Sequence, residues 1–476
     1  MKQVFNPYLP AWEHVPDGEP HVFDGRLYIY GSHDRFNGET YCMEPYVCWS
    51  CPVDDFSDWT YHGIIYTGKE DTRNDGTMYM YAPDVIKHKD KYYLYYGLSE
   101  NKVISVAVSD VPYGPFVFYG HVKHEDGTLL GLKDGDPMQF DPGLFEDEDG
   151  TIYLYTGFSV TEAVQERIRK KANNMNLVLN TMGNYVVELQ DDMLTMKSDI
   201  KNLIPGESNG KGTEYEGHEF YEASSMRKYN GMYYMIYSST QGHELCYAMS
   251  QYPDKDFIYK GVLHSNGNIG IDTEAQYYFA NNHGSLVEIN GHYYIFGHRH
   301  TNHHQFSRQG VAEEIFMNED GTFNQAEMTS CGLNGKPLKG TGDYPAYIAC
   351  VLKSKDGAIQ SSLIHDDNRT NHPAITQESL ENKDAYIVNI QDGTVIGFKY
   401  FELNGLNELS LEVKSSNDGY FEIYADELCI GMIELNACME WKIYSGKTRM
   451  VYGKKALYLV FKGNGSVCLR SISLTV

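Results

Sequence analysis

The chain has 476 residues, which exceeds the length of one typical domain and predicts two or three domains, each with its own core. Lys plus Arg number 39 against 65 Asp plus Glu, so the formal net charge is −26, and 42% of the residues are hydrophobic. A globular chain with this excess of negative charge repels phosphate backbones and anionic membrane surfaces. The composition therefore excludes nucleic acid as an expected partner.

The chain has no segment that suggests a membrane partner. The opening stretch MKQVFNPYLPAWEHVPDGEP lacks an apolar core of signal-peptide length, and no apolar run approaches the roughly 20 residues that span a bilayer. The nine cysteines are scattered and odd in number, unlike the paired framework of a small secreted domain. We expect reduced thiols and a cytoplasmic location, while the oligomeric state stays open.

A strand signature built around tyrosine occurs five times, and tyrosine itself is abundant, with 40 residues. Each copy starts at a hairpin-type turn and alternates aromatic with aliphatic positions. The copies are DGRLYIYGSHD from Asp24, DKYYLYYGLS from Asp90, DGTIYLYTGFS from Asp149, NGMYYMIYSST from Asn230 and NGHYYIFGHRH from Asn290. Three units add a second aromatic strand that closes at Gly63, Gly120 or Gly261. Successive antiparallel strands in repeated units predict a five-bladed β-propeller.

A polar residue precedes each of these strands by a similar distance. The five are Asp17 in PDGEPHVF, Asp84 in YAPDVIKH, Asp141 in FDPGLFED, Glu222 in FYEASSMRK and His283 in NNHGSLVEI. Because the innermost strands of a propeller face its axis, we expect these side chains to converge in one pocket. The alternative is that they only shape the turns before the strands, but Glu222 is a poor turn residue. Clustered carboxylates require a cation or acid–base chemistry to offset their repulsion.

In order along the chain, NPYLP, PDGEPHVF, GSHD, YAPDV, DPGLF, YEASS and NNHGS resemble glycoside hydrolase family 43 from about Asn6 to about Cys350. This resemblance implies five-bladed propellers that hydrolyse arabinose- and xylose-containing saccharides with inversion. It also implies that Asp17 is the general base, Asp141 the residue that positions and tunes the acid, and Glu222 the general acid. The family has Asp-Pro at the base, whereas this chain has Asp17-Gly18 and then Glu19-Pro20; the register with the Tyr28 strand favours Asp17.

The chemistry gives an independent reason for three carboxylates. Inversion needs a carboxylic acid on one side of the sugar and a carboxylate on the other, roughly 6.5–9.5 Å apart, so that a water molecule fits between. Different propeller blades supply such a gap. A third carboxylate near the acid raises its pKa and keeps it protonated near neutral pH.

Further candidate site residues follow from the same motifs. The resemblance places His283 near a calcium ion or a water cluster in the central channel, although a core histidine is an equal alternative. Arg299 in GHRHT, Asp34 and Phe36 in GSHDRFNG, and Asp84 are candidate substrate-binding residues. A surface salt bridge is nearly as good an explanation for Arg299, and Asp34 and Phe36 could instead serve only to pack their loop. We expect no required cofactor and leave calcium open in the channel or the C-terminal domain.

The remaining sequence predicts an insertion and a second domain. TEAVQERIRKKANNMN, which lies inside the third unit, predicts a short helix. Residues 1–355 form the expected propeller, 356–373 a polar linker, and 374–476 a β-sandwich or jelly roll of short, regularly spaced strands. This domain resembles the family 6 carbohydrate-binding modules. It either binds sugar or only buttresses the propeller, and we favour the second interpretation.

The leading functional hypothesis is an exo-acting α-L-arabinofuranosidase that releases arabinose from arabinoxylan- or arabinan-derived oligosaccharides. A β-xylosidase of the same fold is the closest alternative, because the same three carboxylates serve either pentose. A non-catalytic sugar-binding propeller is the alternative from another class. An acid and a base together argue against it, since binding alone requires neither.

Overall fold

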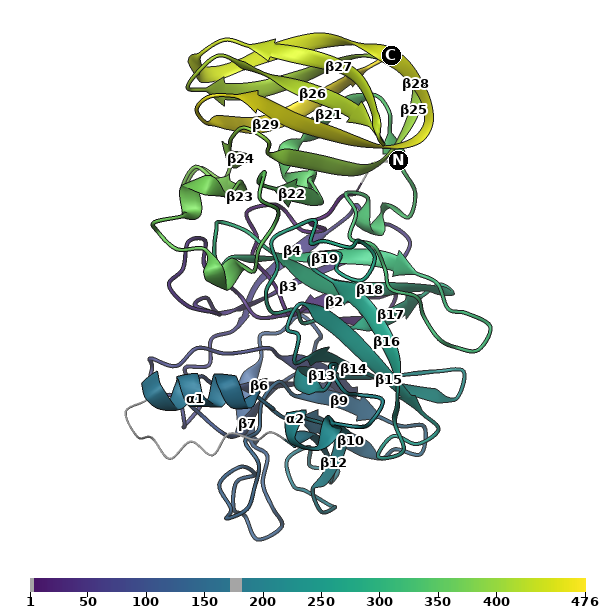
Figure 1. Ribbon diagram of the computed structural model, residues 1–476. Helices are drawn as coiled ribbons and strands as arrows, with labels where there is room; N and C mark the ends of the chain where they lie inside the picture. Colours follow the sequence, from purple (N-terminus) through teal and green to yellow (C-terminus); the bar gives the residue numbers. More distant parts are fainter. Residues whose placement is uncertain (1–3, 172–181) are drawn as a thin grey trace.

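The computed structural model describes residues 4–171 and 182–476, whose strands form five small antiparallel sheets and one large sheet (Figure 1). The small sheets make up the lower part of the view and follow one another along the chain, while the large sheet caps them and carries the C-terminus. The predicted all-β class, a five-bladed propeller followed by a sandwich-like domain, is confirmed. Within the described residues, no helix is long and apolar enough to cross a membrane.

The five small sheets are the blades, and their strands pair in sequence order. The first blade holds β1 (Glu19–Phe23), β2 (Arg26–Tyr30), β3 (Tyr46–Pro52) and β4 (Thr60–Tyr66), and the second β5 (Asp84–His88), β6 (Lys91–Gly97), β7 (Ile104–Ser109) and β8 (Val117–His121). The third holds β9 (Gly143–Glu146), β10 (Ile152–Thr156), β11 (Gly183–Leu189) and β12 (Lys201–Pro205), and the fourth β13 (Phe220–Tyr229), β14 (Met232–Ser239), β15 (Glu244–Ser250) and β16 (Ile258–Ser265). The fifth holds β17 (Leu286–Ile289), β18 (His292–His300) and β19 (Arg308–Ile315).

The repeated turns form the hairpins that the sequence predicts. At Asp24-Gly25, Asn230-Gly231 and Asn290-Gly291, both turn residues have positive φ. That conformation matches the twist of a two-residue hairpin, and Asn, Asp and Gly adopt it at low cost. Each turn joins the first two strands of its blade and so fixes their register. The polar residue upstream of the first strand then lies near the centre of the propeller.

The alternating aromatic strands are buried on both faces, because each blade packs between two others. In β2 the residues Leu27, Tyr28, Ile29 and Tyr30 are all buried. Tyr28 and Tyr30 join a cluster with the second blade, whereas Leu27 and Ile29 join a cluster with the fifth. Tyrosine suits these positions since the ring fills the space between blades and its hydroxyl reaches a polar group at the edge.

The N-terminal segment closes the ring against the fifth blade. Gly18 forms a parallel bridge with Gly284. The Asn6 amide donates to the Ala312 carbonyl and to Glu313, at 3.2 and 2.7 Å, and its oxygen accepts from the Ala312 N–H at 3.0 Å. The first and last blades are thus joined by hydrogen bonds.

The C-terminal domain takes strands from both sides of residue 355. These are β20 (Leu338–Lys339), β21 (Gly342–Pro345), β22 (Val351–Lys353), β23 (Ala374–Gln377), β24 (Ala385–Ile390), β25 (Val395–Ser415), β26 (Gly419–Ala425), β27 (Leu428–Leu435), β28 (Cys438–Gly463) and β29 (Val467–Thr475). β20 and β22 pair with β25, and β21 pairs with β29. Residues before the predicted boundary therefore belong to this sheet, and the division at residue 355 stays a prediction.

Short helices occupy the insertion and the connections. The predicted helix of the third unit is present as α1 (Glu162–Lys171), and α2 (Glu207–Gly210) precedes β13; residues 172–176 of the predicted stretch lie outside the described residues. The 3₁₀ turns are η1 (Gly332–Asn334), η2 (Ala346–Ile348), η3 (Ser361–Leu363) and η4 (Arg369–Asn371). All nine cysteines are free, as the sequence predicts.

Replacing Asn6 by Ala is expected to lower the free energy of unfolding by about 2 kcal/mol, because it leaves buried partners on the fifth blade without hydrogen bonds. The measurement is the shift in the midpoint of urea or thermal unfolding. Asn324→Ala is the control, since Asn324 is exposed and contacts only another surface amide. Equal midpoints for the two variants would contradict the proposed role of Asn6 in closing the ring.

Candidate active site

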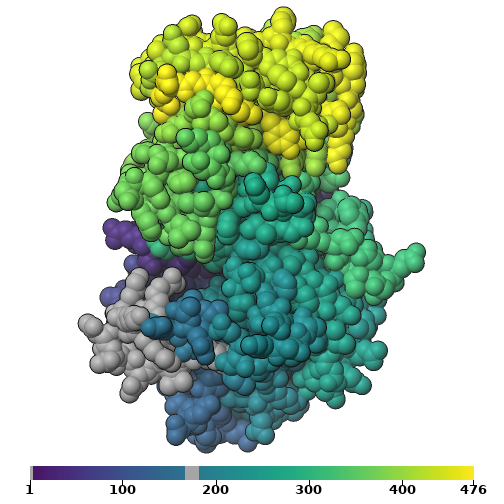
Figure 2. All heavy atoms as spheres, viewed as in Figure 1, coloured from purple at the N-terminus to yellow at the C-terminus, as the bar shows by residue number. Residues whose placement is uncertain are grey.

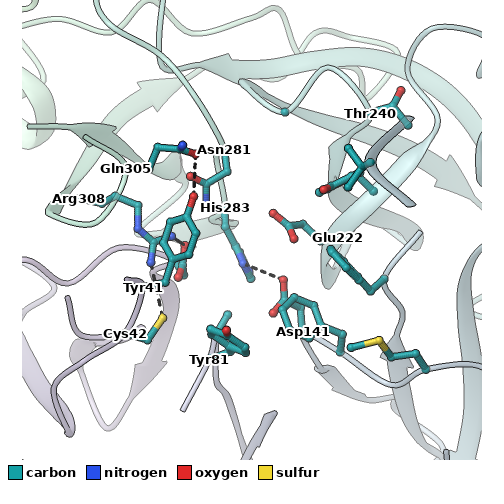
Figure 3. A pocket seen from close by; sticks show the side chains of 18 of the residues that line it. Tyr41, Cys42, Tyr81, Asp141, Glu222, Thr240, Asn281, His283, Gln305 and Arg308 are labelled. Atoms are coloured by element: carbon teal, nitrogen blue, oxygen red, sulfur yellow. Dashed lines mark hydrogen bonds and ion pairs between the residues drawn. The ribbon is translucent and has the colours of Figure 1, made fainter. Parts of the chain in front are cut away.

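A cavity of about 620 Å³ lies where loops from all five blades converge. Asp17, Asp141, Glu222 and His283 line it, so the structure brings together four of the five polar residues that precede the tyrosine strands. Figure 3 shows Arg308 and Glu222 on opposite sides, with His283 between them. The convergence follows from the repeat, because Asp17, Asp141 and His283 lie just before the first strands of their blades and Glu222 lies at the start of β13.

Asp17 is a buried carboxylate held in its charged form. Its Oδ1 accepts from Arg308 Nη1 at 2.8 Å and lies 3.3 Å from His298 Nδ1. Burial alone would raise the pKa of Asp17, but the charge of Arg308 and the contact with His298 outweigh it and hold the pKa well below its usual value. Asp17 is therefore ionised throughout the neutral range, as a general base must be.

Arg308 is fixed by a second carboxylate. Its Nε and Nη2 donate to the two oxygens of Asp34, at 2.8 and 3.0 Å, and its backbone N–H donates to the same group. This two-pronged pairing suits the planar guanidinium. Burial would lower the pKa of Arg308, but Asp17 and Asp34 together raise it, so the side chain stays charged.

Glu222 has the opposite tendency to Asp17. Enclosure within the cavity and, next, the negative charge of Asp141 raise its pKa to about 8. Glu222 therefore holds its proton at neutral pH, as a general acid requires. The two carboxyl groups differ in protonation because Arg308 lies beside Asp17 whereas Asp141 lies beside Glu222.

Asp141 is positioned by the backbone next to Glu222 and by His283. Its Oδ2 accepts from the Ala223 N–H at 3.2 Å and lies 3.5 Å from His283 Nδ1. Burial would lower the pKa of His283, but Asp141, with Asp17 and Glu19 further away, raises it to about 9. The imidazolium offsets part of the negative charge that the clustered carboxylates would otherwise carry.

The backbone at the site adopts an uncommon conformation. Asp17, Asp141 and Ala223 have φ values of 57°, 44° and 68°. Such left-handed positions cost of order 1–3 kcal/mol for a residue with a side chain, and they cluster at functional sites. Each occurs at or next to one of the three cavity carboxylates, which indicates that these carboxylates are held by the surrounding structure.

Glu19 and Asp84 lie outside the cavity lining. Glu19 pairs with Arg227 at 2.8 Å and accepts from Ser225, which leaves Asp17 as the cavity carboxylate of the first blade. Asp84 is fully buried and bonds to His21 at 2.7 Å and to the Leu144 N–H. It joins the first three blades instead of reaching a substrate, which corrects its predicted binding role.

Asp34, Phe36 and Arg299 are also not part of the lining. Asp34 acts on the cavity through Arg308 and through the N–H of the lining residue Cys42, which donates to Asp34 Oδ1 at 2.9 Å. The ring of Phe36 packs 6.2 Å from that of His14. The walls instead carry the aromatic residues Tyr41, Tyr81, Phe140, Phe158 and Tyr221. The sequence did not single these out, since tyrosine and phenylalanine occur throughout the blades.

The arginine that lines the cavity is Arg308 and not the predicted Arg299. In the β18–β19 hairpin, Arg299 lies opposite Gln309 and His300 lies opposite Arg308. Paired residues share a face and neighbours alternate, so Arg299 and Arg308 point to opposite faces. Arg299 bonds to Gln309 and to the carbonyls of Ala349 and Tyr347. In the sequence, only the alternation of faces along the two strands could have distinguished Arg308 from Arg299. Using it requires the register of the hairpin, which the sequence does not provide.

The donor set near His283 does not match a protein-only calcium cage. Calcium takes six to eight oxygen ligands. The ligand atoms of Glu19, His21 and Asp84 lie within 4.8 Å of one another, but Arg227 and His21 already pair with the two carboxylates. A protonated His283 offers no lone pair to a cation. Calcium in the channel or in the sandwich domain stays a prediction, and no catalytic step depends on it.

The comparisons with known proteins agree with this geometry. The sequence model of glycosyl hydrolases family 43 matches residues 18–323. A xylosidase/arabinosidase of Thermoclostridium stercorarium is 45% identical over 484 residues, covering 99% of both chains. The solved β-xylosidase/α-arabinofuranosidase from a compost microbial metagenome, in complex with xylotriose, has a TM-score of 0.52 at 26% identity and covers 68% of this chain and 98% of its own.

A third likeness covers both domains. The family 43 arabinoxylan arabinofuranohydrolase of Bacillus subtilis, solved with cellotetraose, has a TM-score of 0.51 at 19% identity over 99% of this chain and 97% of its own, which shows a shared fold. The propeller, with one ionised and one protonated carboxyl group in its cavity, fits a glycosidase. The chain belongs to glycoside hydrolase family 43, and it is a glycoside hydrolase.

Asp141→Asn is expected to move the alkaline limb of the kcat/KM profile to lower pH. Activity should fall above about pH 8 in the wild type, where Glu222 loses its proton, and removing the adjacent negative charge lowers the pKa of Glu222. The control is Asp147→Asn, a carboxylate outside the cavity that pairs with Lys228. An alkaline limb that stays in place or rises in Asp141→Asn would refute the assignment of Asp141 as the residue that tunes the acid.

Proposed function

We propose that the chain is an exo-acting, inverting α-L-arabinofuranosidase that releases arabinose from arabinoxylan- or arabinan-derived oligosaccharides. The observation that carries the proposal is the opposed protonation of two carboxyl groups in one cavity. Asp17 has its pKa held well below the usual value, and Glu222 has its pKa raised to about 8. A base and an acid are thus available together at neutral pH.

In the proposed reaction, the two groups act from opposite sides of the sugar. Asp17 removes a proton from water as the water attacks the anomeric carbon, while Glu222 gives its proton to the oxygen of the leaving group. Arg308 and His298 contact Oδ1 of Asp17, so we assign the proton from water to Oδ2. Asp17 ends protonated and Glu222 ionised, and exchange with solvent restores both.

Asp141 and His283 support the acid without touching the transferred proton. Asp141 keeps the pKa of Glu222 raised before the reaction, and the His283 imidazolium offsets the extra negative charge once Glu222 has ionised. This chemistry needs only carboxylates and water, which agrees with the expectation that no cofactor is required.

A β-xylosidase activity is the second candidate, and the names of relatives favour keeping it. The Thermoclostridium relative is named for both activities, and a Xylanibacter ruminicola relative at 28% identity is a β-xylosidase. The arabinoxylan arabinofuranohydrolases of Paenibacillus polymyxa and Bacillus subtilis extend along 96% and 94% of this chain. That two-domain likeness supports the arabinose preference.

For the C-terminal domain we propose a buttressing role instead of the sugar binding of a family 6-like module. Two of its aromatic residues, Trp441 and Tyr444, are engaged within the protein. Trp441 has the Arg470 guanidinium 4.1 Å and the Lys414 ammonium 4.7 Å from its ring centroid, and Tyr444 is buried. Contacts with the propeller include the hydrogen bond from the Ser330 N–H to the Lys399 carbonyl at 2.7 Å.

The cytoplasmic location of the protein stays a prediction.

Side-by-side hydrolysis of nitrophenyl α-L-arabinofuranoside and nitrophenyl β-D-xyloside tests the substrate. We expect a higher kcat/KM for the arabinoside, and Glu222→Gln should lower kcat by at least about 10², the usual effect of a lost acid. Glu216→Gln, which removes an exposed carboxylate near the start of the same blade, is the control. A preference for the xyloside above about tenfold, or about 1.4 kcal/mol in the barrier, would replace the proposal by the β-xylosidase.

The stereochemistry of the product tests the mechanism. If water attacks directly with Asp17 as base, an NMR time course on an α-arabinoside should show the β-anomer of arabinose first, followed by mutarotation. A retaining enzyme has its carboxyl groups only about 5 Å apart and forms a covalent intermediate. Early accumulation of the α-anomer would therefore refute the role of Asp17 as base.

A further inference from the structure

Part of the cavity wall comes from outside the propeller. Gln360 and Ser362 line the cavity together with the blade loops, although both lie in the segment 356–373 that connects the two domains. The match to the family ends at residue 323, so these two side chains are not part of the region that defines the family. The connecting segment extends from beneath the C-terminal domain across the propeller, as the green region of Figures 1 and 2 shows.

The segment is fixed to the fifth blade by backbone contacts. Gln360 forms a parallel bridge with Phe279, and the Ser361 N–H donates to the Phe279 carbonyl at 2.7 Å. The Leu363 N–H returns to the Gln360 carbonyl at 2.9 Å and closes the η3 turn. Ser361 is buried under this turn, and its neighbours on either side face the cavity.

A second group of contacts holds the far end of the same segment. His372 accepts at its carbonyl from His303 at 2.9 Å, and its ring bonds to the Tyr278 hydroxyl at 3.1 Å. The Asn302 N–H donates to the Ile375 carbonyl at 2.9 Å. The segment is therefore attached at both ends to the fifth blade, which fixes the backbone from which Gln360 and Ser362 reach the cavity.

Gln360 and Ser362 lie close to the blade that carries the acid. Glu222 begins this blade, and the loop at residues 240–242, between β14 and β15, lines the cavity beside it. The next residue, His243, places its ring 5.6 Å from the ring of Phe279, the residue that pairs with Gln360. The connecting segment thus adjoins the acid-bearing side of the cavity.

We propose that Gln360 and Ser362 form the wall of the subsite for the leaving-group sugar, and that they select oligosaccharide substrates. The inference rests on the proposed function. The acid protonates the leaving-group oxygen, so the leaving group lies on the side of Glu222. An amide and a hydroxyl supply the donors and acceptors that sugar hydroxyls require. In the described part of the chain, neither side chain has a hydrogen-bond partner of its own.

The size of the cavity agrees with a second sugar. Sites of about 300–1,000 Å³ enclose ligands of drug size, and the 620 Å³ here exceeds what one pentose fills. The cavity therefore has room for a sugar beyond the one that reacts, and the connecting segment contributes to its wall.

The test compares two leaving groups in the double variant Gln360→Ala/Ser362→Ala. Nitrophenyl arabinofuranoside has no sugar hydroxyls in its leaving group, so its kcat/KM should stay within about twofold of the wild type. With an arabinoxylo-oligosaccharide, kcat/KM should fall about tenfold, mainly through KM, as expected for lost hydrogen bonds. Leu363→Ala is the matched control, because Leu363 belongs to the same turn but is 55% exposed and outside the cavity lining.

An equal loss on both substrates, or no loss on the oligosaccharide, overturns the inference. Failure of the proposed function gives a different result, a wild type that prefers xylosides. In that case the loss of kcat/KM in the double variant is compared between nitrophenyl xyloside and a xylo-oligosaccharide. Unchanged thermal unfolding of the double variant separates lost contacts from lost folding.

Discussion

The pairing of Arg308 with both Asp17 and Asp34 is the interaction on which the rest of the site depends. A buried carboxylate without a partner would take up a proton, and a protonated Asp17 could not serve as a base. One guanidinium is bonded to Asp34 through two nitrogens and to Asp17 through a third, and its charge keeps Asp17 ionised. Breaking such a buried pair by removing one partner costs about 3–5 kcal/mol. The charge of Asp17, the proposed base, therefore depends on the hairpin of the fifth blade as much as on the first blade.

The propeller makes the difference between the two carboxyl groups possible. Asp17 and Glu222 come from different blades, so each has its own neighbours: Arg308 beside the first, and Asp141 beside the second. A single strand could not provide this, because residues two apart on one face share an environment. The ring also has to close for the site to exist. The hydrogen bonds of Asn6 and the bridge between Gly18 and Gly284 hold the first blade, with Asp17, against the fifth, with Arg308.

The C-terminal domain contributes to the same arrangement from outside the ring. Arg299 bonds to the carbonyl of Tyr347 in η2 and to that of Ala349 just after it, and the connecting segment runs along the fifth blade to the cavity. This placement explains why an extra domain can influence a site that the propeller builds.

The sequence by itself determined the five repeats, their hairpin turns, and the position of Asp17, Asp141, Glu222 and His283 at or just before the first strand of each blade. These features are local, because turn chemistry and alternation act over a few residues. Only the tertiary structure decided which arginine faces the cavity, since one residue of register exchanges Arg299 for Arg308. It also decided that Asp84 holds blades together and that Gln360 reaches the cavity, because contacts between residues distant in sequence leave no local pattern.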